Sequence, residues 1–231
     1  MSYPKTFALP TTDELTGLLS AAYFRHLLRE QLLPQAQTSG DPLSLMLIDI
    51  DNFLGINESY GHAVGDQVLT QVSRIVTANL PKTAIISRYG GDELAAALPD
   101  VRLDDAFTLS EDIRRQVAAL KLKRSAEVKL TCSIGLAAFP AHGKNDVELM
   151  RETDQALYLA KATGRNKVSI PLADSRMITK TSYYTATQLE RLAQLAKRVK
   201  RNEATLLREA LDDLFRKYTD PLSKPPKDEK N

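Results

Sequence analysis

The chain has 231 residues and a net charge of +2, with 43% apolar and 26% charged residues, an ordinary balance for a globular protein. No apolar run approaches the roughly 18 residues that a membrane span requires, and the N-terminus lacks the basic segment and apolar stretch of a signal peptide. Because Cys132 is the only cysteine, no intrachain disulfide can form, and we expect a cytoplasmic protein without a membrane partner.

Charge is distributed unevenly along the chain. Residues 1–173 contain 18 basic and 20 acidic residues, whereas residues 174–218 contain 10 basic and 6 acidic ones. We therefore expect a first domain over residues 1–170 and a second, smaller domain over residues 175–218. The proline-rich and charged residues 219–231 predict a disordered tail.

The first part of the chain alternates helix and strand patterns. Residues Leu43–Ile50 read LSLMLIDI, a continuous apolar run that predicts a central strand buried on both faces. Helical spacing of the apolar residues after Gly65 predicts a helix that begins near Asp66. Two strand-like segments, TAIISRYGG and DELAAALP, then flank a glycine turn, which predicts a β-hairpin with its tip at Gly90–Asp92.

Three more elements follow the hairpin. Helical spacing in DAFTLSEDIRRQVAAL predicts an amphipathic helix, and VKLTCSIGLAAF predicts a strand in which Cys132 is buried in the core. VELMRETDQALYLAKATG predicts a last helix that Gly164 ends. This order of helices and strands is typical of an α+β fold whose sheet is built from split βαβ units.

Two acids stand where predicted strands end. Asp49 closes the central strand and Asp92 lies at the hairpin tip, and in a sheet of split βαβ units these two strands can be neighbours. Their carboxylates would then meet at one edge of the sheet, where two or three oxygen ligands favour Mg²⁺, with water and a triphosphate as the remaining ligands. The alternative is that both acids only punctuate turns.

Five segments, in order, resemble the motifs of the GGDEF-family diguanylate cyclases. RYGGDEL resembles the GG[DE]EF motif, while DELTGLLSAAYF, DIDNFLGINESYGHAVGD, TCSIGLAAFP and TDQALYLAKATGRNKV resemble the other four, and the likeness runs from about Asp13 to Val168. The resemblance implies a bacterial enzyme with a polymerase-palm-like fold, in which helices flank a mostly antiparallel central sheet. It also implies a homodimer that condenses two GTP molecules into cyclic di-GMP with loss of two pyrophosphates.

The resemblance also assigns roles to single residues. Asp49 and Asp92 resemble the carboxylates that hold Mg²⁺ or Mn²⁺, with the carbonyl of Ile50 as a further ligand, and Glu93 resembles the second acid of the motif, near the ribose hydroxyl. Asp49, Asp92 and Glu93 are thus the expected catalytic residues. The expected GTP-binding residues are Asn57 and Asp66 for the guanine, Gly90 and Gly91 for close approach of phosphate, and Lys161 and Arg165 for a phosphate clamp.

Lys161 and Arg165 are spaced i, i+4, so we expect both near the end of the last helix. The alternative for this pair is a solvated basic helix end.

Three features of the sequence depart from the family pattern. Leu94 replaces a phenylalanine and should still point into the core, Leu54 stands where a lysine is common, and Pro81–Ala84 read PKTA in place of the charged R-x-x-D of the product-inhibition site, so we expect no product feedback there.

The C-terminal part has its own pattern. Residues Met177–Thr185 predict one short strand, and two apolar stripes predict helices, one from Ala186 to about Val199 and one after Asn202, a predicted N-cap. One strand and two helices cannot bury these stripes alone, so the segment needs a partner chain. The pattern resembles the ribbon-helix-helix family, in which two chains pair their strands into a ribbon that enters the major groove of DNA.

This second resemblance implies that Thr179, Thr181 and Tyr183 face double-stranded DNA and that Lys200 and Arg201 hold its phosphates. The alternative is a helical hairpin that only dimerises. For the whole chain, the sequence favours a diguanylate cyclase joined to a DNA-binding transcriptional regulator. The competing hypothesis is a non-catalytic DNA-binding regulator that senses GTP or cyclic di-GMP.

Overall fold

The computed structural model of this chain describes residues 11–121, 129–171, 184–199 and 201–219. The chain divides into two compact units, Met1–Met177 and Ile178–Asn231. In the part described, no helix is both long and apolar enough to cross a lipid bilayer.

A six-stranded sheet forms the centre of the first unit. Its strands are β1 (Leu19–Ser20), β2 (Leu43–Ile50), β3 (Ile85–Arg88), β4 (Glu93–Pro99), β5 (Cys132–Phe139) and β6 (Val168–Ser169). They lie in the order β1-β3-β4-β2-β5-β6. β2 pairs antiparallel with both β4 and β5, and β3 pairs antiparallel with β4, whereas the short outer strands pair in parallel. The predicted α+β class and mostly antiparallel central sheet are confirmed.

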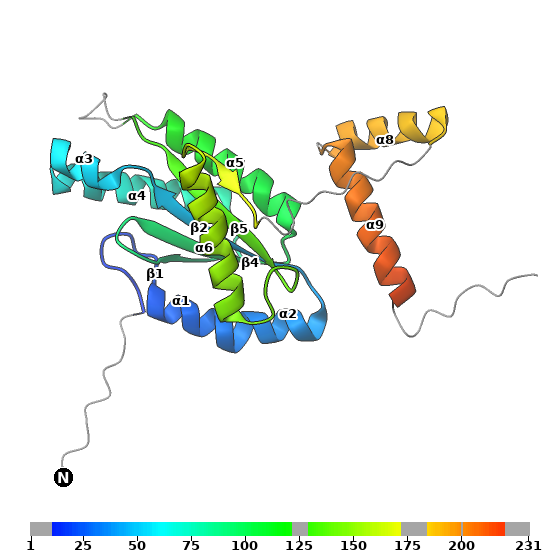
Figure 1. Cartoon of the computed structure of the whole chain (residues 1–231), viewed down its shortest axis with the longest axis horizontal. Coiled ribbons are helices and arrows are strands. Elements are labelled where there is room, and N and C mark those ends of the chain that lie inside the picture. Colours follow the sequence, from blue (N-terminus) through cyan, green and yellow to red (C-terminus); the bar gives the residue numbers. More distant parts are fainter. Residues whose placement is uncertain (1–10, 122–128, 172–183, 200, 220–231) are drawn as a thin grey trace, which may run out of the picture. The chain divides into compact units, whose positions relative to one another are not determined.

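Helices cover both faces of this sheet (Figure 1). They are α1 (Ala21–Leu27), the π-helical segment η1 (Leu28–Leu32), α2 (Leu33–Ser39), α3 (Phe53–Tyr60), α4 (His62–Asn79), α5 (Leu103–Ala119) and α6 (Asp146–Ala162). One core layer joins the sheet to α3, α4 and α5, and the other joins it to α1, η1, α2 and α6.

Strand β2 supplies side chains to both core layers. Ile48 and Ile50 belong to the layer that includes α4 and α5, while Leu45 and Leu47 belong to the layer that includes α1 and α6. All 8 residues of β2 are buried, which confirms the central strand predicted from the continuous apolar run. Because side chains alternate along a strand, Asp49 takes the next place on the face that α6 covers.

The structure differs from the sequence prediction between β2 and β3. Helix α4 begins at His62, not near Asp66, because its first turn is largely exposed and so carries no apolar periodicity. The preceding helix α3 was not predicted, since Ile56 is its only buried residue. Gly61, with a φ of 83°, separates the two helices.

The described residues of the second unit form two helices, α8 (Ala186–Val199) and α9 (Glu203–Thr219), as predicted. The predicted strand Met177–Thr185 lies outside the described residues except for its last two, and residues 220–231 of the predicted tail lie outside them too. Among the side chains described in this unit, only Ala196 is buried. Large apolar side chains are exposed along both helices: Leu189, Leu195, Val199, Leu207, Leu211 and Leu214.

Gly135, in β5, allows helix α6 to lie very close to the sheet. A Cβ atom at this position would be 2.3 Å from the carbonyl oxygen of Thr153 and 2.4 Å from the backbone nitrogen of Leu157. Both atoms belong to the backbone of α6, so a larger residue would force the whole helix away from β5.

We expect Gly135→Ala to lower the free energy of unfolding of the first unit by about 3 kcal/mol, because overpacking displaces a rigid helix. Gly91→Ala is the matched control, since no atom lies within 4 Å of a Cβ built there. Urea titrations followed by circular dichroism measure both variants. Equal stability of the two variants would contradict the close packing of α6 on β5.

Candidate functional site

The pairing of β2 with β4 brings the predicted acids to one edge of the sheet. Asp49 lies opposite Glu93 in the ladder, and the backbone N–H of Ile50 donates to the carbonyl oxygen of Asp92 at 3.3 Å. The N–H of Gly90 donates to the carbonyl oxygen of Glu93 at 3.1 Å and closes the predicted hairpin tip. The two strand ends are therefore neighbours, as the sequence predicts.

Asp49 is a buried acid with one direct cationic partner. It is 6% exposed, and its Oδ2 accepts a hydrogen bond from Lys161 Nζ at 2.6 Å. The pKa of Asp49 is raised to about 6, chiefly by burial and also by the charges of Asp92 and Glu93, although Lys161 acts to lower it. Negative charge therefore accumulates at this edge beyond what Lys161 neutralises, which favours a second cation.

A metal bound here would need ligands from outside the side chains of the protein. Within the described ranges, no group of three or more Asp, Glu, His or Cys side chains is gathered closely enough to hold a metal ion. A cation bound to Asp49 would take its remaining ligands from a neighbouring carboxylate, a backbone carbonyl, water or substrate oxygens. Such ligation suits Mg²⁺, which keeps several waters and binds proteins through one or two carboxylates.

A cleft of about 350 Å³ opens beside the hairpin. This volume falls within the usual range of small-molecule sites. The cleft brings two predicted guanine-binding residues into one cavity with a predicted metal ligand. Its walls come from α3, α4 and the hairpin: Phe53, Leu54, Asn57, His62, Asp66, Leu69, Arg88, Gly91 and Asp92.

Asn57 keeps an unmet hydrogen-bonding requirement at this cleft. Its Oδ1 is buried, and no donor in the described part of the chain reaches it. Gly65 makes room for the amide, because a Cβ there would lie 1.9 Å from Asn57 Oδ1. Buried polar atoms without a partner are uncommon in folded proteins, so this acceptor points to a missing donor.

Of the two residues of the predicted phosphate clamp, Lys161 lies in helix α6 and Arg165 lies after its end. Lys161 lies in the last turn of α6, which ends at Ala162, and Gly164 adopts the left-handed φ of 112° that stops the helix, as predicted. Arg165 lies beyond this point, is exposed and has a φ of 58°. Both residues are thus near the end of the last helix, as predicted, but only Lys161 belongs to it, because the left-handed backbone turns the chain before Arg165.

Arg88 supports the hairpin and was not recognised from the sequence. Its guanidinium donates to the carbonyl oxygen of Gly91 at 2.7 Å and forms an ion pair with Asp13 at 3.2 Å. Burial acts to raise the pKa of Asp13, but hydrogen bonds from Thr16 and the charge of Arg88 bring it below its usual value. Its place in the sequence could have indicated this role, because Arg88 directly precedes the Tyr-Gly-Gly motif and Asp13 begins the N-terminal motif DELTGLLSAAYF.

Asp51 was also missed, although it belongs to the same D-x-D motif as Asp49. It is 6% exposed and accepts hydrogen bonds from Thr131, Ser133 and Asn166. The spacing of the two acids was the available signal. It does not reveal which of them is available to a ligand and which is enclosed by donors.

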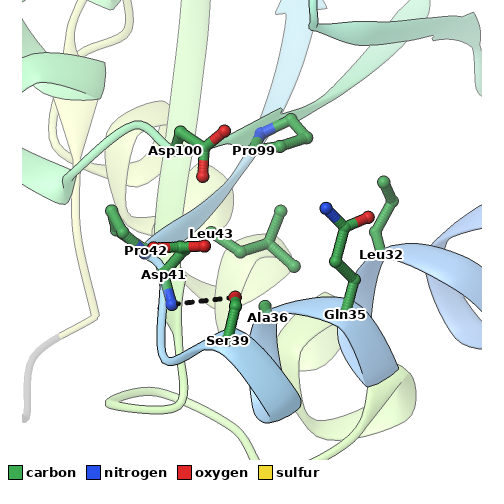
Figure 2. Close-up of a pocket in the computed structure, with 9 residues that line it drawn as sticks. All are labelled: Leu32, Gln35, Ala36, Ser39, Asp41, Pro42, Leu43, Pro99 and Asp100. Atoms are coloured by element: carbon green, nitrogen blue, oxygen red, sulfur yellow. Dashed lines mark hydrogen bonds between the residues drawn. The ribbon is translucent and has the colours of Figure 1, made fainter.

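A second, smaller hollow lies at the other end of β2 (Figure 2). It is bounded by α2 and its flanks, the start of β2 and the end of β4, and its volume of about 10 Å³ holds at most one water molecule. Ser39 Oγ there accepts a hydrogen bond from the N–H of Asp41 at 3.2 Å. None of the predicted site residues lines this hollow, so it is separate from the candidate site at the other end of β2.

Of the predicted DNA contacts, only Arg201 lies among the described residues. Thr179, Thr181, Tyr183 and Lys200 lie outside the described residues. Arg201 is described, and its Nη1 forms an ion pair with Glu209 Oε2 at 2.7 Å, so its guanidinium is held against α9.

Comparison with known proteins gives two family matches. The diguanylate cyclase GGDEF domain matches residues 10–167, and a ribbon-helix-helix domain matches residues 179–219. Response regulator PleD of Caulobacter vibrioides is 37% identical over 163 residues, which cover 69% of this chain and 36% of PleD. Diguanylate cyclase DgcM of Escherichia coli K12 is 39% identical over 156 residues, covering 68% of this chain and 37% of DgcM. The chain thus spans little more than a third of these curated relatives.

Solved structures show the same likeness. The GGDEF domain of DgcB from Caulobacter crescentus, determined in complex with c-di-GMP, matches with a TM-score of 0.65 and 31% identity, over 73% of this chain and 98% of that one. The active GGEEF domain of a diguanylate cyclase from Vibrio cholerae matches with a TM-score of 0.63 and 30% identity, over 67% and 97%. Sequence motifs, sheet topology and these matches agree, and the chain therefore belongs to the diguanylate cyclase GGDEF-domain family.

Proposed function

We propose that this chain is a diguanylate cyclase, which condenses two GTP molecules into cyclic di-GMP and two pyrophosphates. The observation that carries the proposal is the meeting of Asp49 with Asp92 and Glu93 at one sheet edge, beside a cleft that contains Asn57 and Asp66. Acids and a nucleotide-sized cavity at one edge suit a reaction between phosphates and a hydroxyl group.

Mg²⁺ or Mn²⁺ fits the donor set of this edge. The carboxylates of Asp49 and Asp92 and the carbonyl of Ile50 offer hard oxygen ligands, and the surplus of negative charge at Asp49 calls for a cation. Such an ion, when bound, stabilises the charge that develops on the phosphates and on the departing pyrophosphate.

The residues of the chain would bind and orient the substrate. The Asp66 carboxylate accepts hydrogen bonds from the N1–H and N2–H₂ edge of guanine, and the Asn57 amide adds a further polar contact. Gly90 and Gly91 let phosphate approach the hairpin backbone. Glu93 lies beside the ribose and takes the proton of the attacking 3′-hydroxyl.

Two cationic side chains, those of Lys161 and Arg165, would bind the triphosphate. Lys161 already reaches the Asp49 carboxylate, so its ammonium group lies beside an acid that we assign to the metal and can contact a phosphate bound to that ion. Arg165 follows on the loop after α6 and adds a bidentate donor. Their charges offset those of the phosphates and of the leaving pyrophosphate.

The proposed reaction needs a homodimer. Each subunit binds one GTP, and two subunits must face each other so that each 3′-hydroxyl reaches the α-phosphate of the other nucleotide. The second unit can provide this pairing, because the exposed apolar residues of α8 and α9, among them Leu195 and Leu211, have no cover within the described chain.

We further propose that the second unit binds double-stranded DNA. The ribbon-helix-helix match over residues 179–219 supports this role, as does the excess of 10 basic over 6 acidic residues in 174–218. In the paired ribbon, Thr179, Thr181 and Tyr183 read the groove, and Lys200 and Arg201 contact phosphates. A module that only dimerises is the alternative.

One observation favours a second function for the first unit. Leu54, on the wall of the cleft, is 69% exposed and supplies no charge to a triphosphate. A domain with weakened phosphate contacts would sense GTP or cyclic di-GMP without turning substrate over. Product chromatography after incubation of the full chain with GTP and Mg²⁺ separates this function from catalysis.

We expect Asp92→Asn to lower cyclic di-GMP formation by more than about 100-fold, because a neutral amide is a poor Mg²⁺ ligand. Replacing a residue that only supports a metal ligand can already lower activity by up to about 100-fold. Asp100→Asn, at an exposed position after β4, is the control and should keep wild-type activity. Chromatography of the nucleotide products measures both rates. Normal turnover by Asp92→Asn would refute the metal assignment.

Asp49→Asn should stabilise the metal-free protein at neutral pH. The folded pKa of about 6 lies above the usual value of 3.8, so the folded state binds the proton more tightly and stability falls as pH rises from about 4 to above 6. At pH 7.5 the neutral amide removes this cost, a gain of roughly 1–3 kcal/mol that shrinks toward zero near pH 4.

Urea unfolding in the presence of a chelator measures this gain at both pH values. Asp154→Asn is the control, because Asp154 is exposed on α6 and its replacement should change stability little at either pH. A variant Asp49→Asn that is less stable than wild type at pH 7.5 would show that the ion pair with Lys161 outweighs the burial of the carboxylate.

The need for two copies should couple DNA binding to catalysis. If paired ribbons bring two first units together, duplex DNA should raise the cyclase rate roughly tenfold at nanomolar protein, and GTP should strengthen DNA binding by a similar factor. Gel shifts with random duplexes and with DNA upstream of the coding sequence, together with initial rates, measure the two effects.

Leu211→Lys is the control, because it places a charge on the exposed apolar stripe of α9 and should prevent pairing. Both effects should vanish in this variant. A wild-type chain in which DNA leaves the cyclase rate unchanged, and in which a chain ending at Ile170 is fully active at nanomolar concentration, would show that the two units are joined without coupling.

A further inference from the structure

Asp51 accepts hydrogen bonds from three donors in two segments, the start of β5 and the loop after α6. Its Oδ1 accepts from Ser133 Oγ at 2.7 Å, and its Oδ2 accepts from Thr131 Oγ1 at 2.7 Å and from the backbone N–H of Asn166 at 3.0 Å. The backbone N–H of Asp51 donates to the carbonyl oxygen of Thr131 at 3.0 Å. Asp51 therefore ties the end of β2 to the start of β5 and to the loop after α6.

Neutral groups satisfy this buried acid. No lysine or arginine in the described ranges forms an ion pair with Asp51, which is 6% exposed. Three donors already occupy its two oxygens, so little capacity remains for a metal ion. Asp51 thus differs from Asp49, whose contact is with a single lysine at the open edge of the sheet.

The loop after α6 has a backbone that needs such support. Gly164, Arg165 and Asn166 have successive positive φ values of 112°, 58° and 47°, which cost free energy for the two non-glycine residues. The N–H of Arg165 remains bound to the carbonyl oxygen of Ala160 at 3.0 Å, and the next N–H, that of Asn166, points to Asp51. The buried carboxylate thus holds the last of three left-handed residues.

The same loop is held on its other side by α5. Asn166 Oδ1 accepts from Arg114 Nη1 at 2.9 Å, and Arg114 Nη2 forms an ion pair with Glu111 at 2.8 Å. The carbonyl oxygen of Lys167 accepts from the N–H of Ile134 in β5 at 2.9 Å. The loop is therefore bound to α5 on one side and to the sheet on the other, where the buried Asp51 accepts its hydrogen bond.

We propose that Asp51 is a positioning residue, which fixes the loop after α6 so that Lys161 and Arg165 hold their charges at the edge occupied by Asp49. The inference rests on the proposed cyclase function, because it assigns those two cations to the triphosphate. Asp51 itself touches neither substrate nor metal. Its loss acts on GTP binding more than on the chemical step.

The test compares Asp51→Ala with Asp51→Asn in the full chain. Asparagine keeps one oxygen for Thr131 and the Asn166 N–H, while Ser133 can rotate its hydroxyl to accept from the amide. Alanine removes all three side-chain hydrogen bonds and keeps only the backbone bond to Thr131. Asp154→Ala, on the exposed side of α6, is the matched control. The readouts are KM and kcat for GTP and the exchange rate of the Asn166 amide proton by NMR.

We expect Asp51→Ala to raise KM for GTP roughly tenfold with kcat changed less than about threefold, and to speed exchange of the Asn166 amide by about tenfold or more. Asp51→Asn should stay within about threefold of wild type in all three quantities. Unchanged KM and exchange in Asp51→Ala would overturn the proposal. Loss of activity in Asp51→Asn as large as that expected for Asp92→Asn would overturn it too, because it would identify a metal ligand.

A second variant covers the case in which Asp51→Ala does not fold. Arg114→Met releases the other side of the loop at a partly exposed position and should also raise KM with little change in kcat, and an unchanged KM would count against the proposal. If the wild type makes no cyclic di-GMP, the proposed function fails by itself. GTP affinity from calorimetry then replaces KM, and the Asn166 amide still decides the role of Asp51.

Discussion

The pairing of β2 with its two neighbours is the constraint on which the site depends. Asp49 lies opposite Glu93 on one side and Ser133 on the other, and a shift of one residue would turn Asp49 to the opposite face of the sheet, away from α6. Such a shift is strongly disfavoured, because both faces of β2 are buried and its side chains alternate between two core layers. The packing of the core therefore sets the position of the acid.

The candidate site conflicts electrostatically with the fold that holds it. Burial and two neighbouring acids raise the pKa of Asp49, and Lys161 offsets only part of this effect. Functional sites commonly retain such unfavourable charge, since residues chosen for binding are not those that maximise stability. Asp51 shows the opposite solution a short distance away, where neutral donors satisfy a buried carboxylate completely enough to make it a structural anchor.

The two units differ in how far they can be stable alone. The first has two core layers on a shared sheet, whereas the described helices of the second leave their apolar stripes exposed. Burial of apolar surface is the main favourable term in folding, so the second unit gains most from a partner chain. Under the proposed function, the first unit also needs a second copy, and this common requirement is the physical basis for any coupling between them.

The central strand, the hairpin and the helix that Gly164 ends could all be predicted from the sequence, because continuous apolarity, a glycine turn and helical spacing are local properties of the chain. The sequence also identified Asp49 and Asp92 as neighbours. It could not show that Lys161 contacts Asp49 or that Asn166 donates to Asp51, since these pairs are separated by 112 and 115 positions. It placed the start of α4 too late, because an exposed turn leaves no apolar pattern, and it did not reveal the left-handed backbone at Arg165. The contacts of Lys161 and Asn166 depend on strand register and on how closely α6 packs on β5, which are set by packing between residues far apart in the chain.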